Sequence, residues 1–202
     1  MTFKRILAAL VLGAAASGAS AGVLTFDGLT GFMHGAGFPL AAGMHYEGAD
    51  LVYLEGGMAV TLHAPQAAPG DAHVGDGTFN AQTWNWHDGL ENGAGTWVTL
   101  ARADGGRFDL LAFDYLTDLG AVLADGVAAG TIADEGRWST RLAGIRELRI
   151  DAGSYNQIDN VAFDAAPAAV PLPGTLALLL GGAAAARLAR RRNGRDTSEG
   201  KV

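Results

Sequence analysis

The chain has 202 residues and contains no cysteine. This absence excludes disulfide scaffolds, thiol nucleophiles, cysteine-based zinc sites and iron–sulfur clusters. Residues 22–169 also lack a Gly-x-Ser-x-Gly nucleophile motif, and the chain lacks a glycine-rich phosphate loop. The only serines of that stretch, Ser139 and Ser154, have no evident histidine partner. We therefore expect a protein that is not an enzyme.

Positive charge is scarce in the middle of the chain. Residues 22–169 contain 19 acidic residues against six arginines and no lysine. This stretch would repel a phosphate backbone, so nucleic acid is excluded as an expected partner. The basic residues gather at the two ends, with Lys4 and Arg5 near the start and five arginines and Lys201 beyond residue 169. This difference in charge predicts that the two ends of the chain have other roles than residues 22–169.

The N-terminal 21 residues have the pattern of a secretory signal peptide. Lys4 and Arg5 precede an apolar stretch from Ile6 to Ala16. The small residues Ala19 to Ala21 suit signal peptidase. We predict cleavage after Ala21, which leaves Gly22 as the first mature residue; the alternative is a buried N-terminal helix.

No apolar run of the C-terminal region reaches the roughly 20 residues needed to cross a bilayer. The uninterrupted run from Leu176 to Ala186 has 11 residues. The longer segment from residue 170 to residue 189 has 20 residues and a single charge, Arg187. The long side chain of this arginine can snorkel, which keeps its charge in water. We predict a short transmembrane segment over 176–189, an arginine cluster over 187–195 and a disordered tail over 196–202. The positive-inside bias keeps the arginines cytoplasmic and places residues 22–169 outside.

This three-part end resembles the PEP-CTERM sorting signal of Gram-negative bacteria. The sorting residues are Val170, Pro171, Leu172, Pro173, Gly174, Thr175, Arg190, Arg191 and Arg192. Leu172 stands where the name-giving motif has glutamate, as in Val-Pro-Leu-Pro variants. The resemblance implies processing by an exosortase-type transpeptidase and association with exopolysaccharide. An ordinary C-terminal membrane anchor is the alternative.

Residues 22–169 predict an antiparallel β-sandwich. Eight stretches suit strands, several of them with apolar residues at every second position, and Asp-Gly or Gly-Gly turns separate them: 23–26, 51–54, 58–63, 96–102, 108–115, 138–142, 145–150 and 158–163. Residues 119–129 are the one helix candidate, and Gly120, Gly126 and Gly130 argue against it. The stretch Ile158 to Phe163 resembles the closing strand of jelly-roll carbohydrate-binding modules, so we expect a jelly-roll-like sandwich.

Two groups of residues are candidate binding sites. If Trp84 to Trp86 is extended, both indoles face one side and form a sugar platform, with Asn85, His87 and Asp88 as hydrogen-bonding neighbours. The alternative is that these indoles cover one end of the core. Asp27 ends the first predicted strand and Asp159 lies in the last, and these two strands are often neighbours in a jelly roll. Together they would repel each other unless Ca²⁺ bridged them; in the alternative, each aspartate caps its own turn.

The sequence predicts an exported, non-enzymatic protein of the cell envelope or matrix, without a certain cofactor. Its expected partners are signal peptidase, an exosortase-type enzyme, the inner membrane transiently, and polysaccharide. A carbohydrate-binding lectin, with or without Ca²⁺, is the first alternative, and it needs exposed Trp84 and Trp86. A secreted glycosidase or metal hydrolase is the second, and it needs paired carboxylates in a cleft or converging histidines.

Overall fold

The computed structural model describes residues 20–75, 82–89, 92–151 and 153–165. These residues form thirteen β-strands and no helix, which confirms the predicted all-β class. In chain order the strands are β1 (Ser20–Leu24), β2 (Met33–Gly35), β3 (Met44–Glu47), β4 (Asp50–Glu55), β5 (Met58–His63), β6 (His73–Gly75), β7 (Trp84–His87), β8 (Trp97–Arg102), β9 (Phe108–Ala124), β10 (Val127–Trp138), β11 (Leu142–Ile145), β12 (Glu147–Asp151) and β13 (Tyr155–Ala165).

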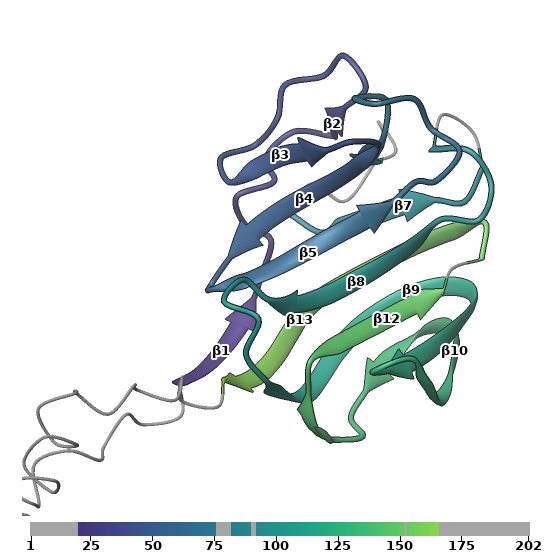
Figure 1. Ribbon diagram of the computed structural model, residues 1–202. Helices are drawn as coiled ribbons and strands as arrows, with labels where there is room; N and C mark the ends of the chain where they lie inside the picture. The colour runs from purple at the N-terminus through teal and green to yellow at the C-terminus, as the bar shows by residue number, and fades with distance from the viewer. Residues whose placement is uncertain (1–19, 76–81, 90–91, 152, 166–202) are drawn as a thin grey trace, which may run out of the picture. The chain divides into compact units, whose positions relative to one another are not determined.

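Eleven of the described strands form one antiparallel sheet (Figure 1). Its main path runs β1-β13-β9-β12-β8-β5-β4-β3, while β10 and β11 also pair with β9, and β7 pairs with β13. Strands β2 and β6 form a separate two-stranded sheet.

The 17-residue strand β9 joins the two halves of the large sheet. Its first part pairs with β13 and its last part pairs with β12, so the sheet divides along this strand. The two halves then meet across the core: the Tyr53 ring of β4 stacks on Trp84 of β7, with centroids 6.1 Å apart and an interplanar angle of 21°. Phe26 lies against both of these rings. A sheet that folds over in this way buries apolar side chains between its faces.

Alternation along the strands selects which side chains enter the core. In β5, Met58, Val60 and Leu62 are buried while the residues between them are partly exposed. In β12, Leu148 and Ile150 are buried and the charged residues between and after them point outward. This period of two is the one that the sequence predicts.

All eight predicted strand stretches overlap observed strands, but β2, β3, β6, β7 and the start of β10 are additional. The helix candidate 119–129 is the end of β9, a turn and the beginning of β10. The turn residues Asp125 and Gly126 have φ of 49° and 77°. Both values lie in the left-handed region that a tight hairpin turn requires, so this segment reverses direction and stays extended on both sides.

The first and last strands are neighbours, as expected. Strand β1 pairs with β13 from Ser20 opposite Ala165 to Leu24 opposite Val161. The predicted signal-peptide cleavage after Ala21 falls inside β1 and leaves Gly22, Val23 and Leu24 in the ladder. Residues 1–19 and the whole predicted sorting signal from residue 170 lie outside the described residues. In the described part of the chain, no helix is long and apolar enough to span a membrane.

Candidate functional site

The predicted tryptophan platform is wrong, because both indoles are buried. Trp84 is 0% exposed and Trp86 is 1% exposed, and both belong to the main hydrophobic core. Strand β7 is extended, so both rings point to the same side, and that side faces the core; Asn85 between them is buried as well. The alternative interpretation, in which the indoles cover core residues, is the one the structure supports.

The other residues of this segment make structural contacts. The His87 ring lies against Tyr155, with centroids 5.0 Å apart. Asp88 Oδ1 accepts hydrogen bonds from the Thr96 backbone N–H at 2.7 Å and from Thr96 Oγ1 at 3.0 Å. Asp88 thus holds the start of β8 close to the end of β7. Neither side chain lies beside an exposed aromatic platform.

The five histidines do not converge. His63 lies between Asp50 and Thr99 on the outer face of β4, β5 and β8, with Nδ1 2.7 Å from Asp50 Oδ2 and Nε2 2.9 Å from Thr99 Oγ1. His34 is buried beside Pro39, whose carbonyl oxygen is 2.8 Å from its Nδ1. Over the described residues, no group of three or more histidine or acidic side chains has the geometry to hold a metal ion.

Asp27 lies in a turn three residues beyond the end of β1 rather than in the strand, but its charge still acts on Asp159 in β13. Burial raises the pKa of the Asp159 carboxyl, and the charges of Asp114, Asp27 and Glu55 raise it further. Asp27 also accepts a hydrogen bond from Thr25 Oγ1 at 2.9 Å. Asp27 thus makes a local turn contact and also raises the pKa of Asp159. The two alternatives for this pair, proximity and local turn capping, therefore do not exclude each other.

A polar cleft of about 680 Å³ surrounds Asp159. It lies over β9, β10 and β13 and is the candidate functional site. Its lining residues combine carboxylates, amides, an arginine and a tyrosine: Asp114, Tyr115, Leu116, Glu135, Gly136, Arg137, Gln157, Asp159 and Asn160.

Strand register places the polar side chains of the cleft in two rows. Arg137, Asp114 and Asp159 are cross-strand partners in one row, and Glu135, Leu116 and Gln157 form the next. Partners in register point to the same face of a sheet. Because the neighbouring Phe113 and Ile158 are buried in the core, this face is the outer one.

The two central carboxylates are held by donors from the cleft itself. Arg137 Nη1 donates to Asp114 Oδ1 at 2.5 Å. The Asn160 side-chain amide donates to both Asp114 Oδ2 at 3.0 Å and Asp159 Oδ2 at 3.2 Å. Asn160 has a φ of 48° at an irregularity in the β13–β9 register, and a bulge of this kind re-aims side chains on a strand.

This arrangement offers hydrogen-bond donors and acceptors side by side, which suits a ligand rich in hydroxyl groups. Asp114, Asp159 and the Asn160 side-chain oxygen are also hard ligands of the type that Ca²⁺ prefers. The sequence points to Asp159 and Asn160, because both lie in the closing-strand pattern. Asp114, Glu135 and Arg137 carry no such signal, since only the pairing of β9 with β10 and β13 brings them there.

Asn85 lies one strand beyond Gln157 in the same row. Its side chain is 1% exposed, and neither its amide nitrogen nor its amide oxygen has a hydrogen-bond partner among the residues described. A buried amide without partners costs free energy.

The described residues therefore define an all-β protein with a large folded antiparallel sheet and a polar cleft on its outer face. Comparison of the chain with protein-family models, with curated proteins and with solved structures gave no match.

Proposed function

We propose that this chain is an exported, non-enzymatic protein of the cell envelope or extracellular matrix, built on a jelly-roll-like β-sandwich. The signal peptide directs export, and signal peptidase removes it after Ala21. The segment from Val170 then tethers the protein in the inner membrane until an exosortase-type transpeptidase acts at the Pro171–Pro173 motif. The sandwich reaches the cell surface or the medium and associates with exopolysaccharide.

One structural observation supports this proposal above the others. Among the described residues, every buried hydrophobic side chain lies between Leu24 and Phe163. Removal of residues 1–21 and of the chain beyond Val170 therefore leaves that core whole. The described part of the chain begins and ends with paired residues, Ser20 and Ala165. A domain bounded in this way tolerates processing at both ends.

The test of the sorting proposal is mass spectrometry of the full-length chain expressed in a bacterium with an exosortase system. We expect a mature product that begins at Gly22 and lacks the arginine cluster. The double variant Pro171→Ala/Pro173→Ala should keep its C-terminus and remain membrane-bound. The matched control Pro65→Ala/Pro69→Ala changes two prolines of the domain and should be processed normally. Released wild-type protein that still ends at Val202, or cytosolic protein that still begins at Met1, would contradict the proposal.

The cleft favours a second, more specific function, which is direct binding of polysaccharide. A cleft of about 680 Å³ lies within the range of small-molecule sites, which is about 300–1,000 Å³. Arg137 and Gln157 supply donors to sugar hydroxyls, and Glu135 supplies an acceptor. A Ca²⁺ ion at Asp114 and Asp159 would also reduce repulsion between this acidic domain and an acidic polysaccharide. The paired carboxylates equally meet the requirement of the glycosidase alternative, but Asn160 bonds to both of them, which favours binding over hydrolysis.

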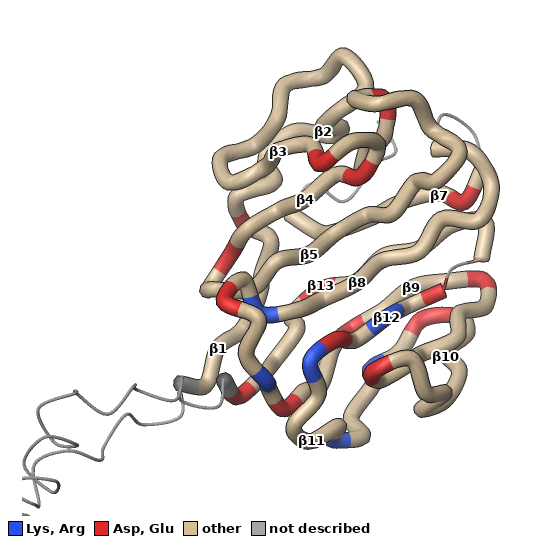
Figure 2. Tube along the Cα trace, viewed as in Figure 1, with Lys and Arg blue, Asp and Glu red and all other residues tan. Residues whose placement is uncertain are grey.

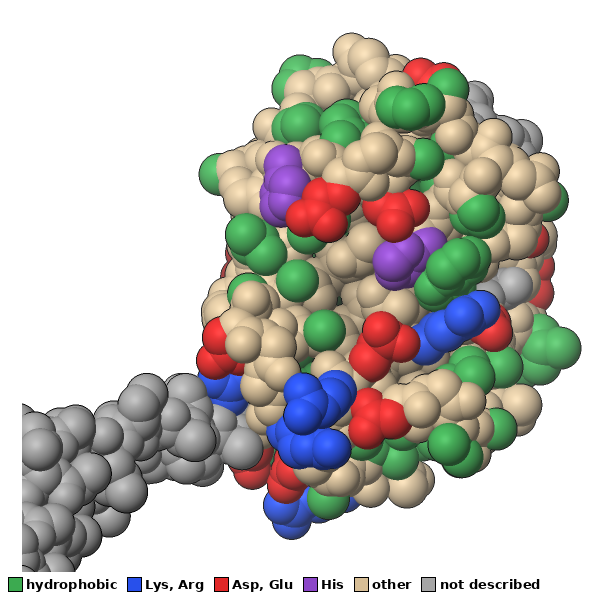
Figure 3. Space-filling view, in the orientation of Figure 1, with side chains coloured by type: hydrophobic (Ala, Val, Ile, Leu, Met, Phe, Trp, Pro, Cys, Tyr) green, Lys and Arg blue, Asp and Glu red, His purple; other side chains and the backbone are tan. Residues whose placement is uncertain are grey.

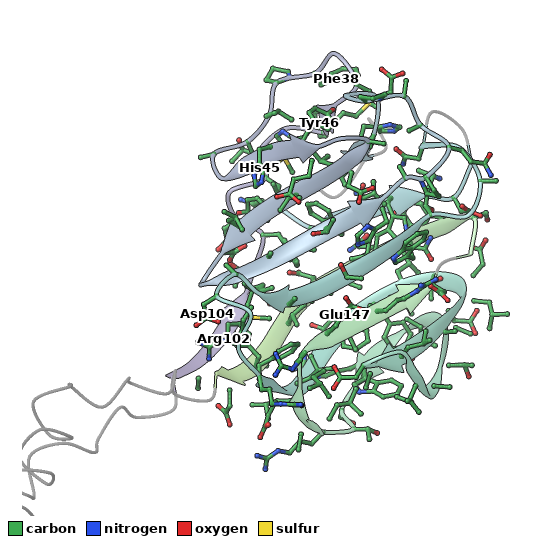
Figure 4. All side chains as sticks on the ribbon, viewed as in Figure 1. Phe38, His45, Tyr46, Arg102, Asp104 and Glu147 are labelled. Carbon is green, nitrogen blue, oxygen red and sulfur yellow. The ribbon has the colours of Figure 1, made fainter. Side chains whose placement is uncertain are left out.

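Titration of the processed protein with neutral and acidic oligosaccharides, with Ca²⁺ or with a chelator, tests this function. Each of Glu135→Ala and Gln157→Ala removes hydrogen bonds worth about 1 kcal/mol, so each should weaken binding about fivefold. The control Glu147→Ala removes an acidic side chain from β12, outside the cleft (Figure 4), and should bind like the wild type. Equal binding by all three variants would place the saccharide elsewhere. Cleavage of the oligosaccharide would support the hydrolase instead.

A further inference from the structure

A segment without charge connects β1 to β3 at one end of the molecule. Residues 28–46 contain no Asp, Glu, Lys or Arg, although the domain around them is strongly acidic. Three large apolar side chains of this segment are exposed: Phe32 at 60%, Phe38 at 48% and Leu40 at 40%. Strands β1 and β3 are at opposite edges of the large sheet, and Figure 1 shows β2 beside β3, away from β1. Figure 3 shows several hydrophobic side chains at that end, as it does elsewhere on this face.

The segment is held firmly in the conformation that exposes these side chains. The Tyr46 hydroxyl donates to the Ala72 carbonyl at 2.8 Å and accepts from the Ala36 N–H at 2.8 Å, so it ties the segment to the chain next to β6. Figure 4 shows Phe38 at the outer end of the loop, with Tyr46 on β3 beneath it.

Glycine makes this close approach possible. Gly75 has a φ of 99°, and a Cβ at that position would lie 2.0 Å from the Phe32 carbonyl oxygen. Gly35 is similarly restricted by the Ala72 carbonyl and the Tyr46 hydroxyl. The backbone beside Phe32 and Phe38 is therefore fixed, and the apolar side chains of this loop stay exposed.

A pocket of about 490 Å³ adjoins the exposed side chains. Its lining includes Met33, Pro39 and Leu40, and no charged residue contributes to it. Because Phe32 directly precedes Met33 and Phe38 directly precedes Pro39, an apolar projection and a hollow without Asp, Glu, Lys or Arg lie side by side. Such a surface is self-complementary: under a two-fold axis, the projection of each copy meets the hollow of the other.

Charge decides between the possible occupants. Figure 2 shows the basic residues confined to the half of the domain that contains β8 to β12, away from β2 and β3. An anionic lipid surface needs basic residues around the apolar ones, and this end has none. A second copy of the same chain is repelled wherever acidic faces meet, but not at an uncharged surface. In the segment 64–75, which contains β6 and pairs with β2, Asp71 is the one charged residue.

We propose that the end formed by Phe32, Phe38 and Leu40 is a self-association surface, on which two copies of this chain dock with the phenyl rings of each against the pocket of the other. The interaction is independent of saccharide binding at the cleft and of the sorting signal. An exported protein with such a contact forms pairs outside the cell.

The absence of cysteine makes a direct test possible. Three full-length variants, Phe32→Cys, Phe38→Cys and Leu40→Cys, each contain a single thiol. We expect oxidation, or a short bifunctional thiol reagent, to produce a covalent dimer from at least one of them. The controls Leu119→Cys and Val127→Cys replace residues that are 61% and 70% exposed on β9 and β10, and they should stay monomeric. No dimer from any of the three positions, or equal dimer from the controls, would overturn the proposal.

A second variant separates docking from chance collision of thiols. Adding Phe38→Asp to the Leu40→Cys variant places a charge in the contact, and the covalent dimer should be lost. Adding Val127→Asp instead should leave the dimer yield unchanged. Unaltered circular dichroism confirms that both double variants fold. Flotation of the wild type with neutral phospholipid vesicles, abolished by Phe38→Asp without any dimer in solution, would assign the surface to lipid and reject self-association.

Discussion

Asp159 and Asp104 are aspartates whose surroundings shift their carboxyl pKa in opposite directions. Burial is the main cause that raises the pKa of Asp159, and neighbouring carboxylates add to it. Asp104 lies on the surface, where the hydrogen bond from Arg102 lowers its pKa to about 2. Figure 4 shows the Arg102–Asp104 pair near the end of β8. The first environment opposes ionisation and the second favours it.

These shifts predict opposite effects of the same substitution. A carboxyl whose pKa is raised on folding stabilises the fold at low pH and loses that contribution as the pH rises through its folded pKa. At pH 7 the ionised Asp159 is therefore unfavourable, and Asp159→Asn should raise the melting temperature. The gain should vanish below the ordinary aspartate pKa of about 3.9. Asp104→Asn should instead lower the melting temperature at pH 7.

Thermal melts of both variants from pH 3 to pH 8 are the measurement. The Asp159→Asn side chain still accepts the Asn160 N–H, which in the wild type lies 2.6 Å from Asp159 Oδ1. A lower melting temperature for Asp159→Asn at pH 7 would show that the ionised carboxylate stabilises the cleft, as a bound cation would require.

Tryptophan illustrates how far single residues can be interpreted from the sequence. The spacing of Trp84 and Trp86 predicts one common side for both rings, and that prediction is correct. Whether that side faces solvent or core depends on Tyr53 and Phe26, which lie far away in the chain and contact Trp84. No local pattern contains this information.

The elements of the sheet depend strongly on their turns. Strands β9 and β10 form the most extensive pair of the described chain, from Val127 opposite Ala124 to Trp138 opposite Phe113. Their turn places Asp125 and Gly126 at positive φ. No atom lies within 4 Å of a Cβ built on Gly126, so the backbone conformation alone decides which residues fit there.

Gly126→Ala should therefore destabilise the domain by about 1 kcal/mol, because alanine adopts the left-handed region at a cost of that size. Gly126→Asn should cost clearly less, since asparagine tolerates this region. Urea unfolding of the two variants measures the difference. Equal losses for alanine and asparagine would mean that space, rather than the φ angle, limits the position.

Longer strands with regular alternation were predictable, and the shortest ones were not. Strands β2, β3, β6 and β7 have only three or four residues, which is too few for alternation to stand out. Only Trp138, the last residue of β10, lies in a predicted strand stretch, because eight of the twelve residues of this strand are exposed. An exposed strand has no apolar face to mark its period.

At the scale of the whole molecule, the three proposals concern three separate regions. The described part of the chain begins and ends at Ser20 and Ala165, which are paired in β1 and β13, and β1 is at one edge of the sheet. The uncharged segment 28–46 lies at the other edge. The cleft lies on the outer face of the sheet, over β9, β10 and β13. Export, saccharide binding and self-association thus use separate surfaces, so each proposal can fail without the others.

Turn residues and the alternation of apolar side chains act over a few neighbouring positions, so they already specify an all-β domain and the outward or inward sense of most strands. The uncharged segment 28–46 can likewise be recognised from the sequence alone. The cleft is not, because Asp114, Glu135 and Asp159 come from three strands that meet only through long-range pairing. Burial of Trp84 and the raised pKa of Asp159 have the same origin: both depend on which distant residues exclude water around them.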